Sequence, residues 1–161
     1  MQTAAPTLAY IALGANLGDR ALNIQAALRL LESVPGIRVT KVSSLLENPA
    51  VGGPADSPPF LNAVAQIETT LEPRQLLQRL LDIEHELGRK RNLKWEPRQI
   101  DLDLLLFGDA VISQPQLVIP HPRMHERRFV LEPLAEIAPK AWHPVLKRTI
   151  ADLLRDLPPA T

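Results

Sequence analysis

Two aspartates, Asp101 and Asp103, lie two positions apart within the apolar run of residues 100–107. That run is bounded by Pro97 and Gly108 and is too short to span a membrane, so it predicts a buried strand. Because side chains alternate along a strand, both carboxylates should share one face, with Cα atoms about 6–7 Å apart. Leu102, Leu104 and Leu106 should take the other face. Two carboxylates on an apolar face repel each other unless a cation lies near them, and magnesium takes such oxygen ligands. Spacing alone equally allows two solvated aspartates on an exposed face.

The residues just before this strand are strongly basic. Five cationic side chains stand against one acid, Glu96, between residues 89 and 98. Arginines beside a carboxylate pair favour a site for a polyphosphate, with metal on one side and guanidinium groups on the other. A solvated basic loop is the alternative interpretation of the same residues. The cations are Arg89, Lys90, Arg91, Lys94 and Arg98.

A third candidate lies on the strand predicted over residues 60–71, where Phe60 and Asn62 share a face. An aromatic ring beside an amide can hold a flat heterocycle by stacking and by hydrogen bonds to its edge. A phenylalanine packed under the Pro-rich segment 47–59 explains the same spacing. The opposite face of the strand is assigned to the core, through Leu61, Ala63, Ala65 and Ile67.

The elements that must position these groups follow a recognisable order. Apolar periodicity and turn residues predict strand, helix, strand, strand, helix, strand. This is the split βαβ pattern repeated, which favours an α+β fold with two helices on one face of an antiparallel sheet. The other face is then free to carry the paired aspartates and the aromatic–amide pair. The expected strands cover residues 8–13, 37–46, 60–71 and 100–107, and the expected helices cover residues 20–34 and 73–88.

Shorter elements are expected around and after these. Asp19 should cap the first helix, and Thr149 should cap a last short helix that ends near residue 157. Residues 107–110 resemble a hairpin turn into a strand at residues 111–112. A helix over residues 129–137 is expected to be interrupted near its internal proline.

Composition restricts the function classes. The chain has 161 residues, which fits a single domain over residues 1–161, and its formal net charge is zero, so no overall field attracts nucleic acid or a membrane. There is no cysteine, which excludes disulfides and thiolate chemistry. No signal peptide and no membrane-length apolar stretch is visible. A cytoplasmic protein is therefore expected.

Taken together, the motifs resemble the 6-hydroxymethyl-7,8-dihydropterin pyrophosphokinase family of the folate pathway. The similarity covers roughly residues 9–154 and is specific through the combination of its parts. Those parts are Tyr-Ile-Ala-Leu-Gly-Ala-Asn-Leu-Gly-Asp at 10–19, Phe-Leu-Asn-Ala-Val at 60–64, Glu84 with Gly88-Arg89, Trp95-Glu96-Pro97-Arg98, Ile-Asp-Leu-Asp at 100–103, Leu-Phe-Gly at 106–108, and Pro-His-Pro at 120–122 with Arg127 and Phe129.

The resemblance implies a ferredoxin-like α+β fold with helices on one face of the sheet and the active site on the other. It implies an ATP-dependent transfer of pyrophosphate to the hydroxymethyl group of the pterin, which leaves AMP. Asp101 and Asp103 would hold two magnesium ions, and Arg89 and Arg98 would contact the phosphates. ATP would be lined by Glu84, Arg91, Trp95, His121 and Arg127, and the pterin would be bound by Phe60, Asn62, Phe129 and backbone groups from Asn48 to Val51.

The family pattern is not matched everywhere. Phe60 stands where tyrosine is frequent, Glu96 where glycine commonly follows the tryptophan, and Asn-Pro-Ala-Val-Gly-Gly from residue 48 where Thr-Pro-Pro is frequent. Loops near residues 14–18, 47–59 and 89–98 would close over the substrates. The last of these is predicted to be mobile in the free protein and to close when ATP-magnesium and the pterin are both bound, with Trp95 covering the closed site.

Two other functions fit parts of the sequence. Ferredoxin-like sheets can stack single-stranded nucleic acid on aromatic side chains, but an aromatic content of 4% and a zero net charge argue against this. A metal-dependent phosphodiesterase also uses paired acids, although it would need more metal ligands than two aspartates. The expected partners are therefore two small substrates, ATP and the pterin, with no nucleic acid and no membrane, and a monomer is expected.

Overall fold

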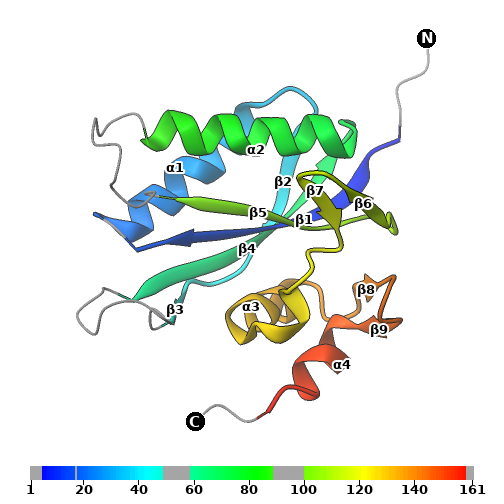
Figure 1. Cartoon of the computed structure of the whole chain (residues 1–161). Helices are drawn as coiled ribbons and strands as arrows, with labels where there is room; N and C mark the ends of the chain where they lie inside the picture. Colours follow the sequence, from blue (N-terminus) through cyan, green and yellow to red (C-terminus); the bar gives the residue numbers. More distant parts are fainter. Residues whose placement is uncertain (1–4, 17, 49–58, 89–99, 159–161) are drawn as a thin grey trace.

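The computed structural model describes residues 5–16, 18–48, 59–88 and 100–158. An antiparallel sheet of five strands forms its centre, and two long helices lie across one face of that sheet (Figure 1). This confirms the predicted α+β fold class. The strands are β1 (Thr7–Ala15), β2 (Ile37–Val42), β3 (Leu46–Asn48), β4 (Phe60–Thr69) and β5 (Asp101–Phe107), and the helices are α1 (Arg20–Ser33) and α2 (Pro73–Gly88).

The strand order is β2-β4-β1-β5, so β1 lies between β4 and β5. Strand β3 pairs with β4 beyond the end of β2. The main core fills the space between this sheet and the helices. Its helical part repeats at the spacing of an amphipathic helix, with Leu76, Leu80, Ile83 and Leu87 of α2 all buried. The first helix begins as predicted, because the Asp19 carboxylate accepts a hydrogen bond from the Leu22 N–H at 3.1 Å.

A second layer covers part of the opposite face, which the sequence pattern left uncovered. Helices α3 (Arg128–Ile137) and α4 (Ile150–Arg155) follow a short 3-10 turn, η1 (Met124–Glu126), and lie below the sheet in Figure 1. They enclose a second core with β1, β4 and β5. A cavity lies over the end of this face near residues 12–14. The second core contains Tyr10, Val64, Leu105, Leu106, Met124, Val130, Leu131, Leu134, Ile150 and Leu153.

A β-bulge in β5 corrects the predicted facing of Leu106. Tyr10 pairs with Leu106 but the next residue, Ile11, pairs with Leu104, so Leu105 is the extra residue. The bulge turns both Leu105 and Leu106 toward the second core, whereas alternation alone placed Leu106 with Leu102 on the helix side. Asp101 and Asp103 precede the bulge, so their shared facing is unaffected.

Several element boundaries also differ from expectation. The strand predicted over residues 37–46 is divided, because the Ser43 hydroxyl accepts from the Val64 N–H between β2 and β3. The strand β6 (Ile112–Gln114) pairs with β7 (Leu117–Ile119) and not with β5. Pro133 does not interrupt α3, which continues through it to Ile137.

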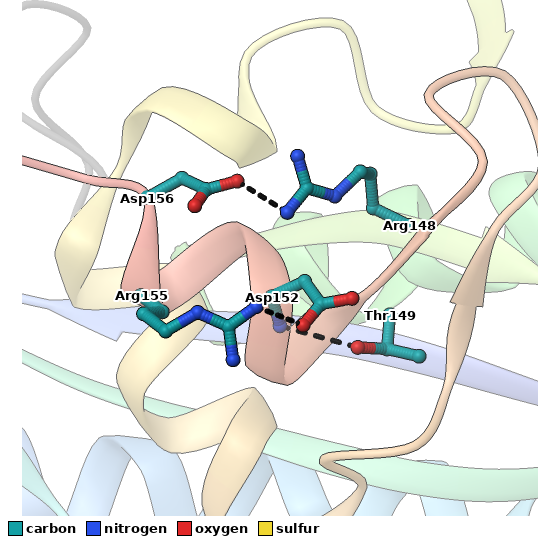
Figure 2. Close-up of polar contacts among 5 residues, drawn as sticks. All are labelled: Arg148, Thr149, Asp152, Arg155 and Asp156. Atoms are coloured by element: carbon teal, nitrogen blue, oxygen red, sulfur yellow. Dashed lines mark hydrogen bonds and ion pairs between the residues drawn. The ribbon is translucent and has the colours of Figure 1, made fainter.

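The C-terminal region is fastened by a local set of charged and polar contacts, which Figure 2 shows. The hydroxyl of Thr149 caps α4 as predicted by accepting from the Asp152 N–H, and Arg155 donates to the carboxylate of Asp152. Arg148 pairs with Asp156 at 2.7 Å. The hydrogen bond from Arg155 lowers the pKa of the Asp152 carboxyl.

None of the helices in the described ranges combines the length and apolar character that a bilayer crossing requires.

A buried histidine lies beside this region, on β8 (Trp142–His143), which pairs with β9 (Arg148–Thr149). The side chain of His143 is buried, its Nδ1 accepts from the Leu146 N–H at 3.0 Å, and its Nε2 has no hydrogen-bond partner among the described residues. Burial, together with nearby His125, lowers the pKa of His143. The folded protein therefore holds this imidazole neutral where the unfolded chain would protonate it.

We expect this histidine to make the fold sensitive to mild acid. Because the folded-state pKa is the lower one, its contribution is complete above the unfolded pKa of about 6.5 and is lost as the pH falls below it. Urea unfolding between about pH 7.5 and about pH 5.5 should show a smaller loss of stability for His143→Gln than for the wild type. His85→Gln, at an exposed position on α2, is the control. Equal losses for His143→Gln and wild type would refute this.

Candidate active site

The site is assembled by the pairing register of three strands. On the open face, Gly14 of β1 pairs with Asn62 of β4 on one side and with Asp101 of β5 on the other. Two residues earlier, Ala12 is likewise the partner of Asp103. Residues at matched register positions on neighbouring strands point to the same face. The predicted amide and the predicted carboxylate pair therefore lie on one face, separated by a single strand of small residues.

The short strand β3 extends this face beyond β4. Asn48 pairs with Phe60, and Leu46 pairs with Asn62. A cavity of about 600 Å³ opens over the combined surface. Its floor comes from the sheet and its wall from η1 and the start of α3. The lining residues are Ala12, Leu13, Gly14, Asn48, Phe60, Asn62, Ala63, Asp101 and Asp103 on the floor, and Arg123, Glu126, Arg127, Arg128, Phe129 and Val130 on the wall.

Gly14 gives the floor its shape. A Cβ atom added there would lie 2.9 Å from the Asn62 Nδ2 and 3.9 Å from the Phe60 ring. The absence of a side chain thus lets the Asn62 amide lie flat against β1. Asn62 is 8% exposed, and its Oδ1 has no hydrogen-bond partner within the described part of the chain. A buried amide oxygen of this kind is a ready acceptor for a donor on a ligand.

Two aromatic rings from different elements line the cavity. Phe60 belongs to β4 and Phe129 to α3, and both line the same space. The guanidinium of Arg127 lies over the Phe129 ring, with Cζ 5.7 Å from the ring centroid, which is a cation–π contact. The wall therefore offers an aromatic face and a positive charge side by side.

The floor of the site carries two acids, whereas its wall carries three arginines against one acid, Glu126. Asp101 and Asp103 are partly buried on the floor, and the wall contributes Arg123, Arg127 and Arg128. Arg128 is held by Glu132 at 3.2 Å and by the Pro158 carbonyl at 2.7 Å. A ligand that carries both an apolar ring and several phosphate oxygens would match this arrangement.

His121 lies beside the carboxylates but is not one of the cavity-lining residues. Its Nδ1 accepts from the Arg123 N–H at 3.2 Å, so the neutral ring carries its proton on Nε2. Burial lowers the pKa of His121, the Asp103 carboxylate acts in the opposite direction, and Arg127 and Arg123 add to the lowering. The imidazole is accordingly a neutral donor near Asp103 at ordinary pH.

Glu84 contacts the strand that carries the aspartates. Its Oε2 accepts from the Leu102 N–H at 2.7 Å, between Asp101 and Asp103. Among the described strands β5 is the outer one, so no described strand lies on that side to accept from this N–H. The resemblance led us to expect Glu84 on the ATP side. The structure shows a contact of Glu84 with the backbone of β5, and its nucleotide role stays a prediction.

The sequence argument did not select several residues that line the cavity. Gly14 was included only in the motif at residues 10–19 and in the loop near residues 14–18, and the polar, basic segment that contains Arg123, Glu126 and Arg128 was not selected. That segment lies next to the Pro-His-Pro motif, and this proximity was the available signal. Five predicted site residues lie outside the described residues, and their roles stay predictions: Val51, Arg89, Arg91, Trp95 and Arg98.

A donor set of two aspartates can be compared with what different metals require. In the described ranges, no cluster of three or more His, Cys, Asp or Glu side chains is arranged to hold a metal ion. Magnesium usually takes only one or two protein carboxylates and fills its other positions with water and substrate phosphates. The pair Asp101 and Asp103, facing a cavity with room for a ligand, fits that pattern.

Comparison with known proteins adds independent information. Residues 10–139 match the family model described as 7,8-dihydro-6-hydroxymethylpterin-pyrophosphokinase (HPPK). The chain is 51% identical over 130 residues to the 2-amino-4-hydroxy-6-hydroxymethyldihydropteridine pyrophosphokinase of Bacillus subtilis strain 168, covering 81% of this chain and 77% of that protein. It is 41% identical over 151 residues to the folic acid synthesis protein fol1 of Schizosaccharomyces pombe, covering 94% of this chain but 20% of that protein.

A solved structure agrees at the level of the fold. The chain superposes on wild-type HPPK-DHPS of Plasmodium falciparum with a TM-score of 0.75 at 17% identity. The superposition covers 93% of this chain and 44% of that one, so this chain spans less than half of that protein. At such low identity the likeness shows a common fold alone. The match to the family model and the close bacterial relative establish that the chain belongs to the 7,8-dihydro-6-hydroxymethylpterin-pyrophosphokinase family.

Proposed function

We propose that this chain transfers pyrophosphate from ATP to the hydroxymethyl group of 6-hydroxymethyl-7,8-dihydropterin, in folate biosynthesis. The products are AMP and the pterin diphosphate. The observation that carries this proposal is the single cavity that Phe60, Phe129 and the pair Asp101 and Asp103 share. An aromatic subsite beside a carboxylate pair suits a reaction between a flat heterocycle and a metal-bound polyphosphate.

The pterin is proposed to lie between the rings of Phe60 and Phe129. Stacking on such rings contributes about 0.5–1.5 kcal/mol per pair beyond the burial of area. The Oδ1 of Asn62, which has no partner among the described residues, would accept from the edge of the heterocycle, and Asn48 would lie at its other side. Val51, outside the described residues, is proposed to add a backbone contact.

Asp101 and Asp103 are proposed to hold two magnesium ions. When bound, these ions would neutralise the phosphate oxygens and orient the polyphosphate. The protein then has two tasks, which are to hold the two carboxylates in place and to supply cationic side chains on the opposite side of the cavity. The strand pairing of β5 and the Glu84 contact perform the first task, and Arg127 on the wall contributes to the second.

The nucleotide side is proposed to include residues that the resemblance indicates. His121 offers an Nε2–H donor near Asp103, which suits an oxygen acceptor on ATP. Arg89 and Arg98 are proposed as the phosphate ligands that act in the transition state. Arg91, Trp95 and Arg127 complete the proposed set, and Glu84 is proposed to support this side of the site by holding the β5 backbone at Leu102.

The chemistry is a direct displacement. The hydroxymethyl oxygen attacks the β-phosphorus, the bond from that phosphorus to the α-phosphate oxygen breaks, and AMP leaves while the hydroxyl proton is released. Such a transfer needs alignment and charge stabilisation more than a covalent nucleophile. The cavity provides alignment through its paired rings, because these fix the plane from which the hydroxymethyl arm extends toward the carboxylates.

The two alternative functions are less well supported. A phosphodiesterase or a single-stranded nucleic-acid module would share the paired acids or the exposed aromatic ring, but neither matches the family to which the chain belongs. We also propose that the protein acts as a monomer and as one domain over residues 1–161. A cytoplasmic location follows from the proposed use of ATP.

The identity of the nucleotide product tests the proposed reaction. Purified protein, ATP, magnesium and 6-hydroxymethyl-7,8-dihydropterin should yield AMP and the pterin diphosphate in equal amounts by chromatography. Release of ADP would indicate transfer of a single phosphoryl group and would refute the assignment. Cleavage of a phosphodiester substrate without ATP would favour the first alternative.

Replacing either aspartate should nearly abolish turnover. Asp101→Ala and Asp103→Ala each remove half of the proposed metal ligand pair, and we expect kcat to fall by about 10³-fold or more. Asp109→Ala changes an exposed aspartate just beyond the far end of the same strand and should leave kcat unchanged. Circular dichroism would establish folding in all three variants. Near-normal turnover in either site variant would contradict the metal role.

Glu84 should act through the backbone of β5. Glu84→Ala leaves the Leu102 N–H without its acceptor, a loss of about 1–3 kcal/mol, and should raise the magnesium concentration needed for half-maximal rate. Glu84→Gln keeps an acceptor oxygen and should recover most of the activity. Glu86→Ala, exposed on the same helix, is the control. If Glu84→Gln is as impaired as Glu84→Ala, and binds ATP equally poorly, the carboxylate acts on the nucleotide instead.

A further inference from the structure

Arg20, the first residue of α1, reaches from the helix side of the sheet to the end of the β3–β4 ladder. Its guanidinium donates from Nη1 to the Pro59 carbonyl at 2.7 Å and from Nη2 to the Glu47 carboxylate at 2.9 Å. Pro59 directly precedes Phe60, and Glu47 directly precedes Asn48. One side chain thus hydrogen-bonds to the two residues that directly precede the cavity-lining residues Asn48 and Phe60.

The ladder at this point is short. Strand β3 is three residues long, and its last pair joins Asn48 to Phe60. Such a short strand is only weakly held by its own backbone pairing. Two hydrogen bonds from one rigid guanidinium fork restrain both strands at the same time.

Burial separates Arg20 from an ordinary surface ion pair. The Arg20 side chain is 26% exposed and that of Glu47 is 60% exposed. Exposed ion pairs contribute little, so the Glu47 contact alone would be of small consequence. The contact with the Pro59 carbonyl is the stronger reason for a role, because it acts on the backbone that leads directly into Phe60.

We propose that Arg20 is a positioning residue for the pterin subsite, one that sets the spacing of Asn48 and Phe60 without touching the substrate. This inference rests on the proposed function, because it assigns the pterin to that part of the cavity. Arg20 should therefore influence pterin affinity and leave nucleotide affinity unchanged. Its conformational effect on the ladder should be present without any ligand.

The chain contains a matched control in Arg74, the second residue of α2. Its guanidinium donates from Nε and Nη2 to the Gln114 side-chain oxygen and from Nη2 to the Pro115 carbonyl at 3.2 Å. Arg74 resembles Arg20 because each guanidinium binds one side-chain oxygen and one proline carbonyl. Pro59 directly precedes β4, and Pro115 lies between β6 and β7. None of these three residues lines the cavity. Loss of Arg74 therefore tests what a purely structural clamp contributes.

The experiment compares Arg20→Ala, Arg20→Lys, Glu47→Gln and Arg74→Ala with the wild type. Calorimetry measures binding of an ATP analogue with a methylene group between the α- and β-phosphates, in magnesium, and then of 6-hydroxymethyl-7,8-dihydropterin. Arg20→Ala should weaken pterin binding about tenfold and change the analogue's Kd by less than about twofold. Arg20→Lys should show an intermediate loss because one ammonium cannot reproduce the fork. Glu47→Gln keeps an acceptor and should resemble the wild type, as should Arg74→Ala.

Hydrogen exchange without ligands gives a readout that does not depend on the proposed function. Amides of residues 46–48 and 60–62 should exchange faster in Arg20→Ala and, to a smaller extent, in Arg20→Lys, but not in Arg74→Ala. The positioning role would be overturned if Arg20→Ala left the exchange of these amides unchanged. It would also be overturned if Arg20→Ala bound the pterin as tightly as the wild type does. Equal weakening of both ligands by Arg20→Ala and Arg74→Ala would overturn it too, since that result indicates a general loss of stability. If wild-type protein fails to bind the pterin, the proposed function fails, while the exchange data still decide whether Arg20 holds the ladder.

Discussion

The pairing of β1 with both β4 and β5 is the constraint on which the site depends. Because Gly14 is the partner of Asn62 and of Asp101, three strands present their functional positions in a single row. A register slip of one residue in either ladder would turn that strand's functional side chain into the helix-side core. The buried residues on the opposite face of β1, Ile11 and Leu13, make such a slip costly because they would lose their packing.

The second layer converts this row into a cavity. A sheet face alone would expose Phe60 and the two aspartates to water, where stacking and ionic contacts are weak. The start of α3 and its N-cap residue reduce this exposure by placing Phe129 and Arg127 across from them. The same helix is anchored far from the site, since Glu136 accepts hydrogen bonds from the N–H and hydroxyl of Ser44. Packing of α3 is therefore part of the geometry of the site.

The sequence predicts the local features of this protein well and its long-range features less completely. Alternation places Asp101 and Asp103 together, and the caps at Asp19 and Thr149 follow from side-chain chemistry within three residues. The extra residue at Leu105 and the pairing of β6 with β7 depend on contacts between separate segments, which periodicity does not encode. The same reason explains why Gly14 was not recognised, because its importance comes from Asn62, far along the chain.

The two outer edges of the site are held by side chains from the helix layer on the far side of the sheet. At one edge Arg20 of α1 fastens β3 to β4, and at the other Glu84 of α2 binds the outer strand β5 at Leu102. Edge strands lack a second neighbour, so they are the parts of a sheet that move most easily. Both outer strands carry cavity-lining residues, which are Asn48 on β3 and Asp101 on β5. The central strands align the residues of the site through their pairing, and Arg20 and Glu84 of the two helices restrain its outer edges.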